Sequence, residues 1–334
     1  MRLTGLRLSS IPSLLLRICL LAPLAWYLFC SLVPAGNGSV TADISFPPGT
    51  GIKKLASDLQ QAGVIRSRWH FMLTARLKGA ARQLKAGDYR ISNAMTPGSI
   101  IAKIAAGQVD YRRFTLPEGY SIYQAAELLA QKQIFSSDEF LAACRNRDLL
   151  KQHGIAGESA EGYLYPATYN LSLDQTPLQL VNQMVLRFRK AYGTAGEGTA
   201  GKGLSQHQVV TLASIIEKEA VVPQERPLIA SVFHNRLRIG MPLQSDPTAV
   251  YGVRAFSGKV SGSDLEHKSP YNTYLVKGLP PGPIGNPSAD AIRAALNPTQ
   301  STYLYFVARK DGTHYFSNSL DEHNRAVYRY LKQK

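Results

Sequence analysis

The chain has 334 residues, an apolar fraction of 45% and a formal net charge of +15, which predicts a folded protein of more than one average domain. The charge is uneven, because residues 34–113 hold twelve Lys/Arg against four acids, while residues 114–334 hold twenty-three against nineteen. Such a basic segment suits an anionic surface, either phospholipid headgroups or a wall polymer. Nucleic acid, the usual rival partner, is disfavoured by the export signal described next.

An apolar segment opens the chain. Between residues 11 and 33 the only charged side chain is Arg17, and spanning a bilayer takes roughly 20 apolar residues. The preceding residues carry arginines and no acid, so the positive-inside rule predicts a cytoplasmic tail at 1–10. We expect a single-pass anchor at 11–33 in the cytoplasmic (inner) membrane with the rest outside it. A signal peptide cleaved near Ala35 is the alternative, and it also exports the body.

A short linker at 34–42 precedes a predicted α+β module at 43–113. Its turn-rich spacing and apolar periodicity predict two strands and three helices. A serine is expected to cap the last helix, at Ser99. This module is either a structural spacer or a small polymer-binding domain. The predicted strands are 42–46 and 87–91, and the predicted helices are 52–62, 67–77 and 99–106.

Longer helices are predicted beyond residue 114, at 121–131, 137–145 and 177–192. The glycine-rich segment 193–203 is interpreted as a surface loop, because its lysine is not followed by the Ser or Thr that a phosphate-binding loop needs. Segment 303–317 predicts a hairpin that turns at Asp311 and Gly312. No histidine has the spacing of a metal ligand, so neither a metal nor a cofactor is expected.

The helix that begins after Ser205 holds two candidate acids. Ser205 and Gln208 fit a capping box, and the apolar stripe that follows places Glu217 and Glu219 on its opposite shoulders. A half-sheltered carboxyl suits general acid catalysis. Periodicity does not choose between the two, although small residues one turn before Glu217 leave room for a ligand. The plainer interpretation is that both glutamates form ion pairs with basic side chains at the surface.

Four segments rich in proline and tyrosine are predicted to form a binding surface. Proline stiffens loops, tyrosine rings offer apolar faces to sugars, and Asn, Gln and Ser offer hydrogen bonds to hydroxyl and amide groups. This composition predicts a polar, uncharged polymer such as a glycan as the ligand. The segments are 160–171, 242–252, 269–287 and 303–317.

Three long motifs, LASIIEKEA, QSDPTAVYG and SPYNTYLVKGLPPGPIGNP, occur in the order found in one family. The chain resembles the endolytic murein transglycosylases of the MltG (YceG-like) type along its whole length. The resemblance implies an α+β protein with a transmembrane helix, a LysM-like domain at 43–113 and a catalytic domain at 114–334. The chain departs from the family pattern at three positions. The family usually has Phe in place of Tyr165 and Asp in place of Ala167, and it often has Gly in place of Ser288.

By this resemblance Glu217 is the catalytic acid/base, and the implied reaction cuts the MurNAc–GlcNAc bond within nascent peptidoglycan strands. The product would carry a 1,6-anhydro-MurNAc end, and strand elongation would stop there. Proximity to peptidoglycan synthases is also implied. Asp246 would stabilise the transition state, or else cap a turn before Pro247. The candidate sugar-binding residues are Tyr163, Gln244, Ser245, Asp246, Asn272 and Tyr274.

Two other functions stay open from the sequence. A muramidase would hydrolyse the same bond with Asp246 as the partner carboxylate, because ordinary glycosidases use two such groups. A catalytically idle glycan-binding scaffold for wall synthesis would need neither acid. The end group of the product separates the first from a transglycosylase, and a Glu217→Gln variant separates the second.

Overall fold

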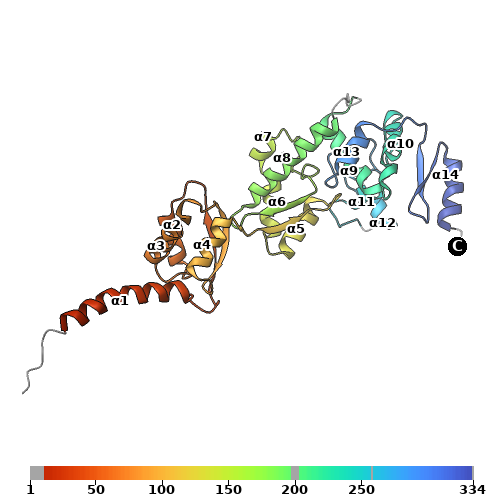
Figure 1. Cartoon of the computed structure of the whole chain (residues 1–334). Coiled ribbons are helices and arrows are strands. Elements are labelled where there is room, and N and C mark those ends of the chain that lie inside the picture. The colour runs from red at the N-terminus through yellow and green to blue at the C-terminus, as the bar shows by residue number, and fades with distance from the viewer. Residues whose placement is uncertain (1–10, 197–202, 257–258, 333–334) are drawn as a thin grey trace, which may run out of the picture. The chain divides into compact units, whose positions relative to one another are not determined.

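The computed structural model describes residues 11–196, 203–256 and 259–332. By its internal contacts the chain divides into two units, Met1–Arg112 with Asn170–Asp174, and Arg113–Tyr169 with Gln175–Lys334. Helices alternate with three two-stranded sheets, β1-β2, β3-β4 and β5-β6. The predicted mixed α+β class is therefore confirmed (Figure 1).

The apolar N-terminal segment forms one helix, α1 (Ile11–Leu32), with Pro23 inside it. Its last turns pack within the first unit, where the rings of Trp26 and Tyr27 contact His70. In the described ranges, which omit the predicted tail at 1–10, no helix has both the length and the apolarity needed to cross a membrane.

The first unit is built on an antiparallel pair, β1 (Thr41–Phe46) and β2 (Gly87–Ser92), in the register that joins Thr41 to Ser92 and Phe46 to Gly87. Ile44 and Phe46 of β1 and Tyr89 and Ile91 of β2 are buried at alternate positions, which is the period-2 pattern of a half-covered sheet, and Asp88 of β2 is buried as well. Its core also takes apolar residues from three helices and a 3-10 turn. These are α2 (Ile52–Gln61), α3 (Arg68–Leu77), η1 (Ala80–Arg82) and α4 (Pro97–Ala106).

The predicted cap of α4 was wrong by one turn. The helix begins at Pro97, and its cap is Thr96, whose hydroxyl accepts a hydrogen bond from the backbone N–H of Ser99. Proline is favoured in the first turn because its missing N–H would have no helical partner there. Ser99 therefore lies inside the helix rather than before it.

The second unit begins at Arg113, within β3 (Arg112–Thr115), and contains the expected helices with shifted ends. Ser121 caps α5 through a complete capping box, as its position predicts, whereas α6 is capped by Ser136. The predicted loop at 193–203 was wrong at its start, since 193–196 are helical and 197–202 lie outside the described residues. The elements are α5 (Ile122–Gln131), α6 (Ser137–Cys144), α7 (Arg147–Gln152), β4 (Thr168–Leu171) and α8 (Pro177–Gly196).

The central helix of this unit is α9 (Gln206–Glu219), which packs against α10, α11 and α13. Ser205 and Gln208 form the predicted capping box at its start. The predicted hairpin is also confirmed, with Gly312 at positive φ in its turn. The remaining elements are η2 (Pro223–Glu225), α10 (Arg226–Arg238), α11 (Asp246–Val250), α12 (Gly262–Glu266), α13 (Ala289–Leu296), β5 (Tyr305–Ala308), β6 (His314–Ser317), α14 (Leu320–Val327) and η3 (Tyr328–Lys332).

Candidate active site

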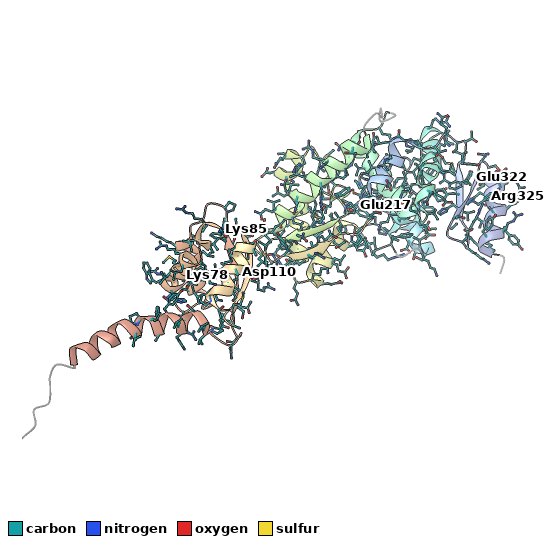
Figure 2. The ribbon with its side chains drawn as sticks, in the orientation of Figure 1. Lys78, Lys85, Asp110, Glu217, Glu322 and Arg325 are labelled. Atoms are coloured by element: carbon teal, nitrogen blue, oxygen red, sulfur yellow. The ribbon has the colours of Figure 1, made fainter. Side chains whose placement is uncertain are left out.

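The helix α9 is buried on more than one face. All residues from Val209 to Ile216 are buried, so the apolar stripe predicted from periodicity is only part of the buried surface. The helix reaches the surface at its first turn, through Gln206 and Gln208, and again at its last turn, which carries the half-buried Glu217, Lys218 and Glu219. Figure 2 shows Glu217 among the closely packed helices of this unit. The chain therefore presents three ionisable groups at the end of an otherwise apolar core helix.

Glu217 is enclosed by hydrogen-bond donors from two distant segments. Its Oε1 accepts a hydrogen bond from Nη2 of Arg226 at 2.8 Å. Its Oε2 accepts one from the backbone N–H of Ser288 at 2.8 Å and another from the Ser288 hydroxyl. Only 6% of the Glu217 side chain is exposed. Three donors thus fix the orientation of a sheltered carboxylate, because hydrogen bonds to a charged acceptor are stronger than neutral ones.

Two loops pack back to back beside this carboxylate. The N–H of Gly119 donates to the carbonyl of Asn286 at 2.8 Å, and the N–H of Asn286 donates to the carbonyl of Tyr120 at 2.9 Å. A Cβ on Gly119, which has φ +72°, would lie 3.4 Å from Cγ of Glu217. A Cβ on Gly285 would lie 2.5 Å from the carbonyl oxygen of Gly119. Both positions therefore require glycine, and the loops pass close to Glu217 only because both have it.

A second carboxylate approaches the arginine that holds Glu217. Nη2 of Arg226 lies 3.9 Å from Oε2 of Glu118, whose side chain is 59% exposed. Partial burial, together with the negative charge of Glu217, raises the pKa of Glu118. Nε of Arg226 is buried and has no hydrogen-bond partner among the described residues. No pattern in the sequence pointed to Glu118, because its contact with Arg226 depends on how the loops meet.

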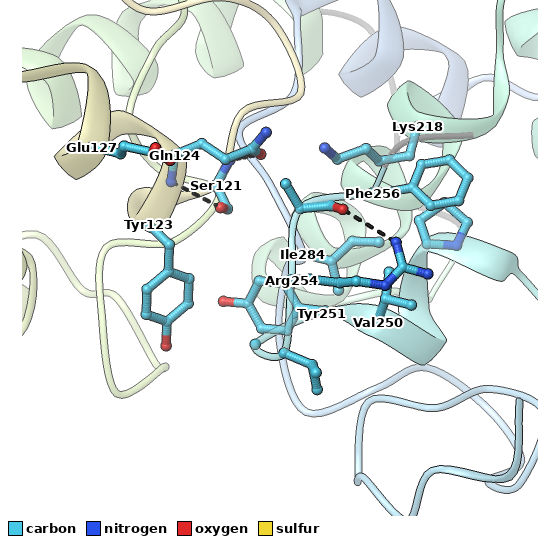
Figure 3. Close-up of a pocket in the computed structure, with 14 residues that line it drawn as sticks. Ser121, Tyr123, Gln124, Glu127, Lys218, Val250, Tyr251, Arg254, Phe256 and Ile284 are labelled. Atoms are coloured by element: carbon cyan, nitrogen blue, oxygen red, sulfur yellow. Dashed lines mark hydrogen bonds between the residues drawn. The ribbon is translucent and has the colours of Figure 1, made fainter. Parts of the chain in front are cut away.

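A small cavity adjoins the other side of α9. It has a volume of about 220 Å³, and Lys218 extends its amine into it (Figure 3). Burial lowers the pKa of Lys218, and the charges of Glu161 and Glu217 oppose that shift. The cavity thus places a cationic group beside the helix end that carries Glu217. Its other lining residues include Ser121, Gln124, Glu127, Tyr251, Arg254 and Ile284.

A larger groove of about 1160 Å³ shares Tyr123 and Tyr251 with that cavity. The ring of Tyr251 lies 6.2 Å from that of Tyr123 and 4.6 Å from that of Tyr271, centroid to centroid. Such a run of tyrosines offers apolar faces to sugar rings. The motif residues Tyr251 and Tyr271 stood in segments predicted to bind glycan, but their role as a joint surface was missed because α5 supplies the third ring.

Beneath this groove lies a buried acid, Glu161, which is 3% exposed. Its oxygens accept hydrogen bonds from the N–H of Ile122, the hydroxyl of Tyr251 at 3.0 Å and the amide of Asn286 at 3.2 Å. Burial raises its pKa to about 7. Because Asn286 also pairs with Tyr120, Glu161 braces the same loops that enclose Glu217.

Four of the predicted sugar-binding residues gather around Glu219 instead of Glu217. The Ser245 hydroxyl donates to Glu219, and the Tyr274 hydroxyl donates to Asp246. Burial raises the pKa of Glu219 to about 7, and the negative charge of Asp246 acts in the same direction. Gln244 is exposed at the same cavity, of about 410 Å³. The two glutamates of α9 therefore have separate partners.

The other two predicted sugar-binding residues are buried. Tyr163 is 4% exposed, packs against Phe188, and shares a hydrogen bond of 3.1 Å with Nδ1 of His207. Asn272 is fully buried, and its amide donates to the carbonyls of Leu265 and His267. In this geometry both side chains fasten neighbouring segments together. Sugar contact from any of the six residues stays a prediction.

Ser288 departs from the family pattern, and nothing in the sequence singled it out as a partner of Glu217. In the structure both its N–H and its hydroxyl donate to Glu217. Ala167, another departure, lies away from Glu217 in sequence and accepts the N–H of Leu116 through its carbonyl. A side-chain acid is thus not needed there to hold that backbone contact.

Comparison with known proteins places the chain in a family. The endolytic murein transglycosylase of Bacillus subtilis (strain 168) is 33% identical over 314 residues, covering 89% of this chain and 87% of that protein. A protein of the same name from Streptococcus pneumoniae serotype 2 is 30% identical over 341 residues, and the match spans 62% of its length. The crystal structure of a yceG-like protein from Listeria monocytogenes superposes with a TM-score of 0.58 at 34% identity, covering 86% of this chain and 99% of that one. Since the YceG-like family model also matches residues 44–329, the chain belongs to the YceG-like family.

Proposed function

We propose that the chain is an endolytic lytic transglycosylase that cuts peptidoglycan glycan strands between MurNAc and GlcNAc. The observation that carries the proposal is the setting of Glu217, a sheltered carboxylate fixed by Arg226 and Ser288 at the end of α9. It supports this activity because the relatives of the chain are named endolytic murein transglycosylases. Cleavage would terminate elongation of the strand.

The chemistry requires one acid that works twice. Protonated Glu217 gives its proton to the leaving glycosidic oxygen as the bond from C1 of MurNAc breaks. The resulting carboxylate then accepts the proton of the MurNAc C6 hydroxyl while that oxygen bonds to C1. The product is a 1,6-anhydro ring, and no water is consumed. A second carboxylate nucleophile is unnecessary, because the substrate supplies its own.

The proposal assigns sugar binding to the tyrosine surface as well as to the residues predicted from the motifs. Tyr123, Tyr251 and Tyr271 line the larger groove, which adjoins the small cavity that Lys218 enters. Gln244, Asp246 and Tyr274 line the cavity on the Glu219 side of α9. A polymer needs contacts on both sides of the bond that is cut. The two cavities therefore suit an enzyme that acts within a strand.

The test is a digest of purified peptidoglycan strands by the full chain and by its Glu217→Gln variant, with fragment ends identified by mass spectrometry. Anhydro ends, one water lighter than reducing ends and absent with the variant, are the expected result. Reducing ends would establish the hydrolase instead, with Asp246 as the candidate partner. Equal strand binding by both proteins without any cleavage would favour the non-catalytic scaffold.

We further propose that α1 anchors the chain in the cytoplasmic membrane with the catalytic unit outside, in proximity to peptidoglycan synthases. The support is the sequence, with its apolar run and its arginines before the helix. Protease added to intact spheroplasts should remove the catalytic unit and leave the N-terminus protected. Protection of the whole chain would overturn this orientation.

We also propose that residues 43–113 form a LysM-like module that binds glycan. Its support is the basic charge of this segment and its two strands with flanking helices. In cosedimentation with peptidoglycan, reversing the charge of exposed Lys78 and Arg76 together should lower the bound fraction of the Glu217→Gln chain. An unchanged bound fraction would leave the module a spacer.

A further inference from the structure

Arg226 is shared between two carboxylates of very different exposure. The same nitrogen, Nη2, lies 2.8 Å from Glu217 and 3.9 Å from Glu118. The arginine itself is 8% exposed, and its Nε has no hydrogen-bond partner among the residues described. A buried N–H without an acceptor is destabilising, because it has lost its water and gained no partner. The present arrangement therefore leaves the guanidinium incompletely satisfied.

A small movement of Glu118 would satisfy both nitrogens. An arginine presents Nε and one Nη in a fork that matches the two oxygens of a carboxylate. The backbone of Glu118 is held by the hydrogen bond from Gly119 to Asn286, while its side chain is largely exposed. The Glu118 side chain therefore has room to change rotamer while its backbone stays in place. Glu217, by contrast, is fixed by Ser288 as well as by Arg226.

This sharing matters because the proposed reaction needs Glu217 in two protonation states. An arginine in contact with Glu217 stabilises its carboxylate, which suits the interval after Glu217 has given its proton to the leaving oxygen. The same contact opposes the protonated state in which Glu217 must start, and it opposes the uptake of the C6 proton at the end. The contact between Arg226 and Glu217 must therefore weaken whenever Glu217 carries a proton.

We propose that Glu118 is a positioning residue that draws Arg226 away from Glu217 while Glu217 carries its proton and releases it while Glu217 is a carboxylate. The inference rests on the proposed function for its two steps. Glu118 itself exchanges no proton with the substrate. In the first step the C1–O4 bond breaks and O4 takes the proton of Glu217. In the second, C1–O6 forms, the C6 hydroxyl proton passes to Glu217, and Arg226 turns back toward Glu118.

Other charged groups also face this site and define the control. Lys218 follows Glu217 on α9, and Asp290 lies in the first turn of α13, where its charge acts on Glu118. Asp290 is 62% exposed and pairs with Arg293 rather than Arg226. Asp290→Asn therefore removes a nearby negative charge without touching the shared arginine. It is the matched control for Glu118→Gln.

The experiment measures kcat/KM of the full chain against pH with peptidoglycan strands. The alkaline limb of such a profile reports loss of the protonated acid. Without Glu118, Arg226 stays on Glu217, so Glu118→Gln should move this limb down by about one pH unit. Glu118→Asp should move it in the same direction, because the shorter side chain retains the charge but does not reach the arginine. Asp290→Asn should leave it in place.

Three results would overturn the inference. One is an unmoved limb in Glu118→Gln, with a uniform loss of rate at every pH. Another is a parental limb in Glu118→Asp, which would mean that charge alone matters. The third is an equal shift in Asp290→Asn, which would mean that any nearby acid has the same effect.

A second readout does not depend on cleavage. With glutamate labelled by ¹³C at Cδ, and Glu217→Gln to assign the signal, the Glu217 resonance can be titrated without substrate. Its midpoint should lie at lower pH in Glu118→Gln than in the parent, and should not move in Asp290→Asn. If the unsubstituted chain makes no anhydro ends, the proposed function is wrong. The titration does not depend on cleavage, so it still decides whether Glu118 and Glu217 share Arg226.

Discussion

Ser288 donates two hydrogen bonds to the same oxygen of Glu217, one from its backbone N–H and one from its hydroxyl. Ser288 is also the N-cap of α13, where its hydroxyl accepts from the N–H of Ala291. The carboxylate thus lies at the positive end of a helix, which stabilises a negative charge. One serine therefore links the start of α13 to the proposed acid/base.

Ser288→Gly tests what the hydroxyl adds to this link. Glycine keeps the N–H that binds Glu217 and is a good N-cap, so the free energy of unfolding should fall by only a few tenths of a kcal/mol, and cleavage should persist. Ser288→Ala loses the cap and should cost about 1 kcal/mol. Denaturant unfolding and the rate of anhydro-end release measure both. If Ser288→Gly were as inactive as Glu217→Gln, the hydroxyl would belong to the chemistry itself.

Glu217→Gln and Glu219→Gln separate the two acids of α9. Glutamine at 217 has the same shape and keeps one acceptor oxygen, for either Arg226 or Ser288. We expect the fold to persist while cleavage falls by about 10²- to 10⁴-fold, the usual contribution of a general acid. Glu219→Gln should retain most of the activity, because Glu219 contacts Ser245 on the other side of the helix. Circular dichroism and anhydro-end release are the measurements. The opposite ranking of the two variants would transfer the acid role to Glu219.

Gly285→Ala probes the backbone contact beside Glu217. The added Cβ would lie 2.5 Å from the carbonyl oxygen of Gly119, so one of the two loops must move. We expect a loss of about 1–3 kcal/mol in unfolding free energy and a fall in cleavage rate on the order of 100-fold from the displaced loop. Gly193→Ala, in α8, is the control, since its Cβ meets nothing within 4 Å. Full activity in Gly285→Ala would show that the loops can separate without cost.

Glu161 should make the stability of the protein depend on pH. Its pKa is about 7 in the fold against an ordinary value of 4.5, so between these values the folded state binds more protons than the unfolded state. The free energy of unfolding should therefore fall as pH rises from 4.5 to 7, by roughly 1–3 kcal/mol from this group. Glu161→Gln should flatten that dependence, measured by denaturant unfolding at pH 5 and pH 7.5.

Glu219 adds a contribution of the same sign, so some slope should remain in the Glu161→Gln variant. Glu266→Gln, an exposed acid at the end of α12, is the neutral control. Stability that rises with pH over this interval in the parent, or an unchanged slope in Glu161→Gln, would contradict the assignment.

The parts of the fold that depend on neighbours in sequence could be predicted. The capping box of Ser205 and Gln208 and the turn at Gly312 were correct, because each is decided within a few residues. The start of α4 was missed because Thr96 and Pro97 compete locally with Ser99 for the same role. The apolar stripe of α9 gave only one face of a helix that is buried on several.

The site was predictable only in part, because its contacts span long stretches of chain. Glu217 and Ser288 are 71 residues apart, and Glu161 and Asn286 are 125 apart, so neither pair leaves a pattern in one sequence. The polar motif residues after Pro242 were expected near Glu217, yet Ser245 contacts Glu219. The types of side chain indicated the kind of ligand. Tertiary packing decides which loop contacts Glu217 and which contacts Glu219.

The pairing of Asn286 with Tyr120 has a consequence for when this protein becomes able to cut. The amide of Asn286 reaches the carbonyl of Tyr120 across 166 residues, and the adjoining Ser288 completes the contacts of Glu217. A chain still being synthesised, or broken before this segment, holds α9 but lacks the donors that orient its acid. Of the donors that hold Glu217, the two from Ser288 are therefore the last to be added, after Arg226 is already in place.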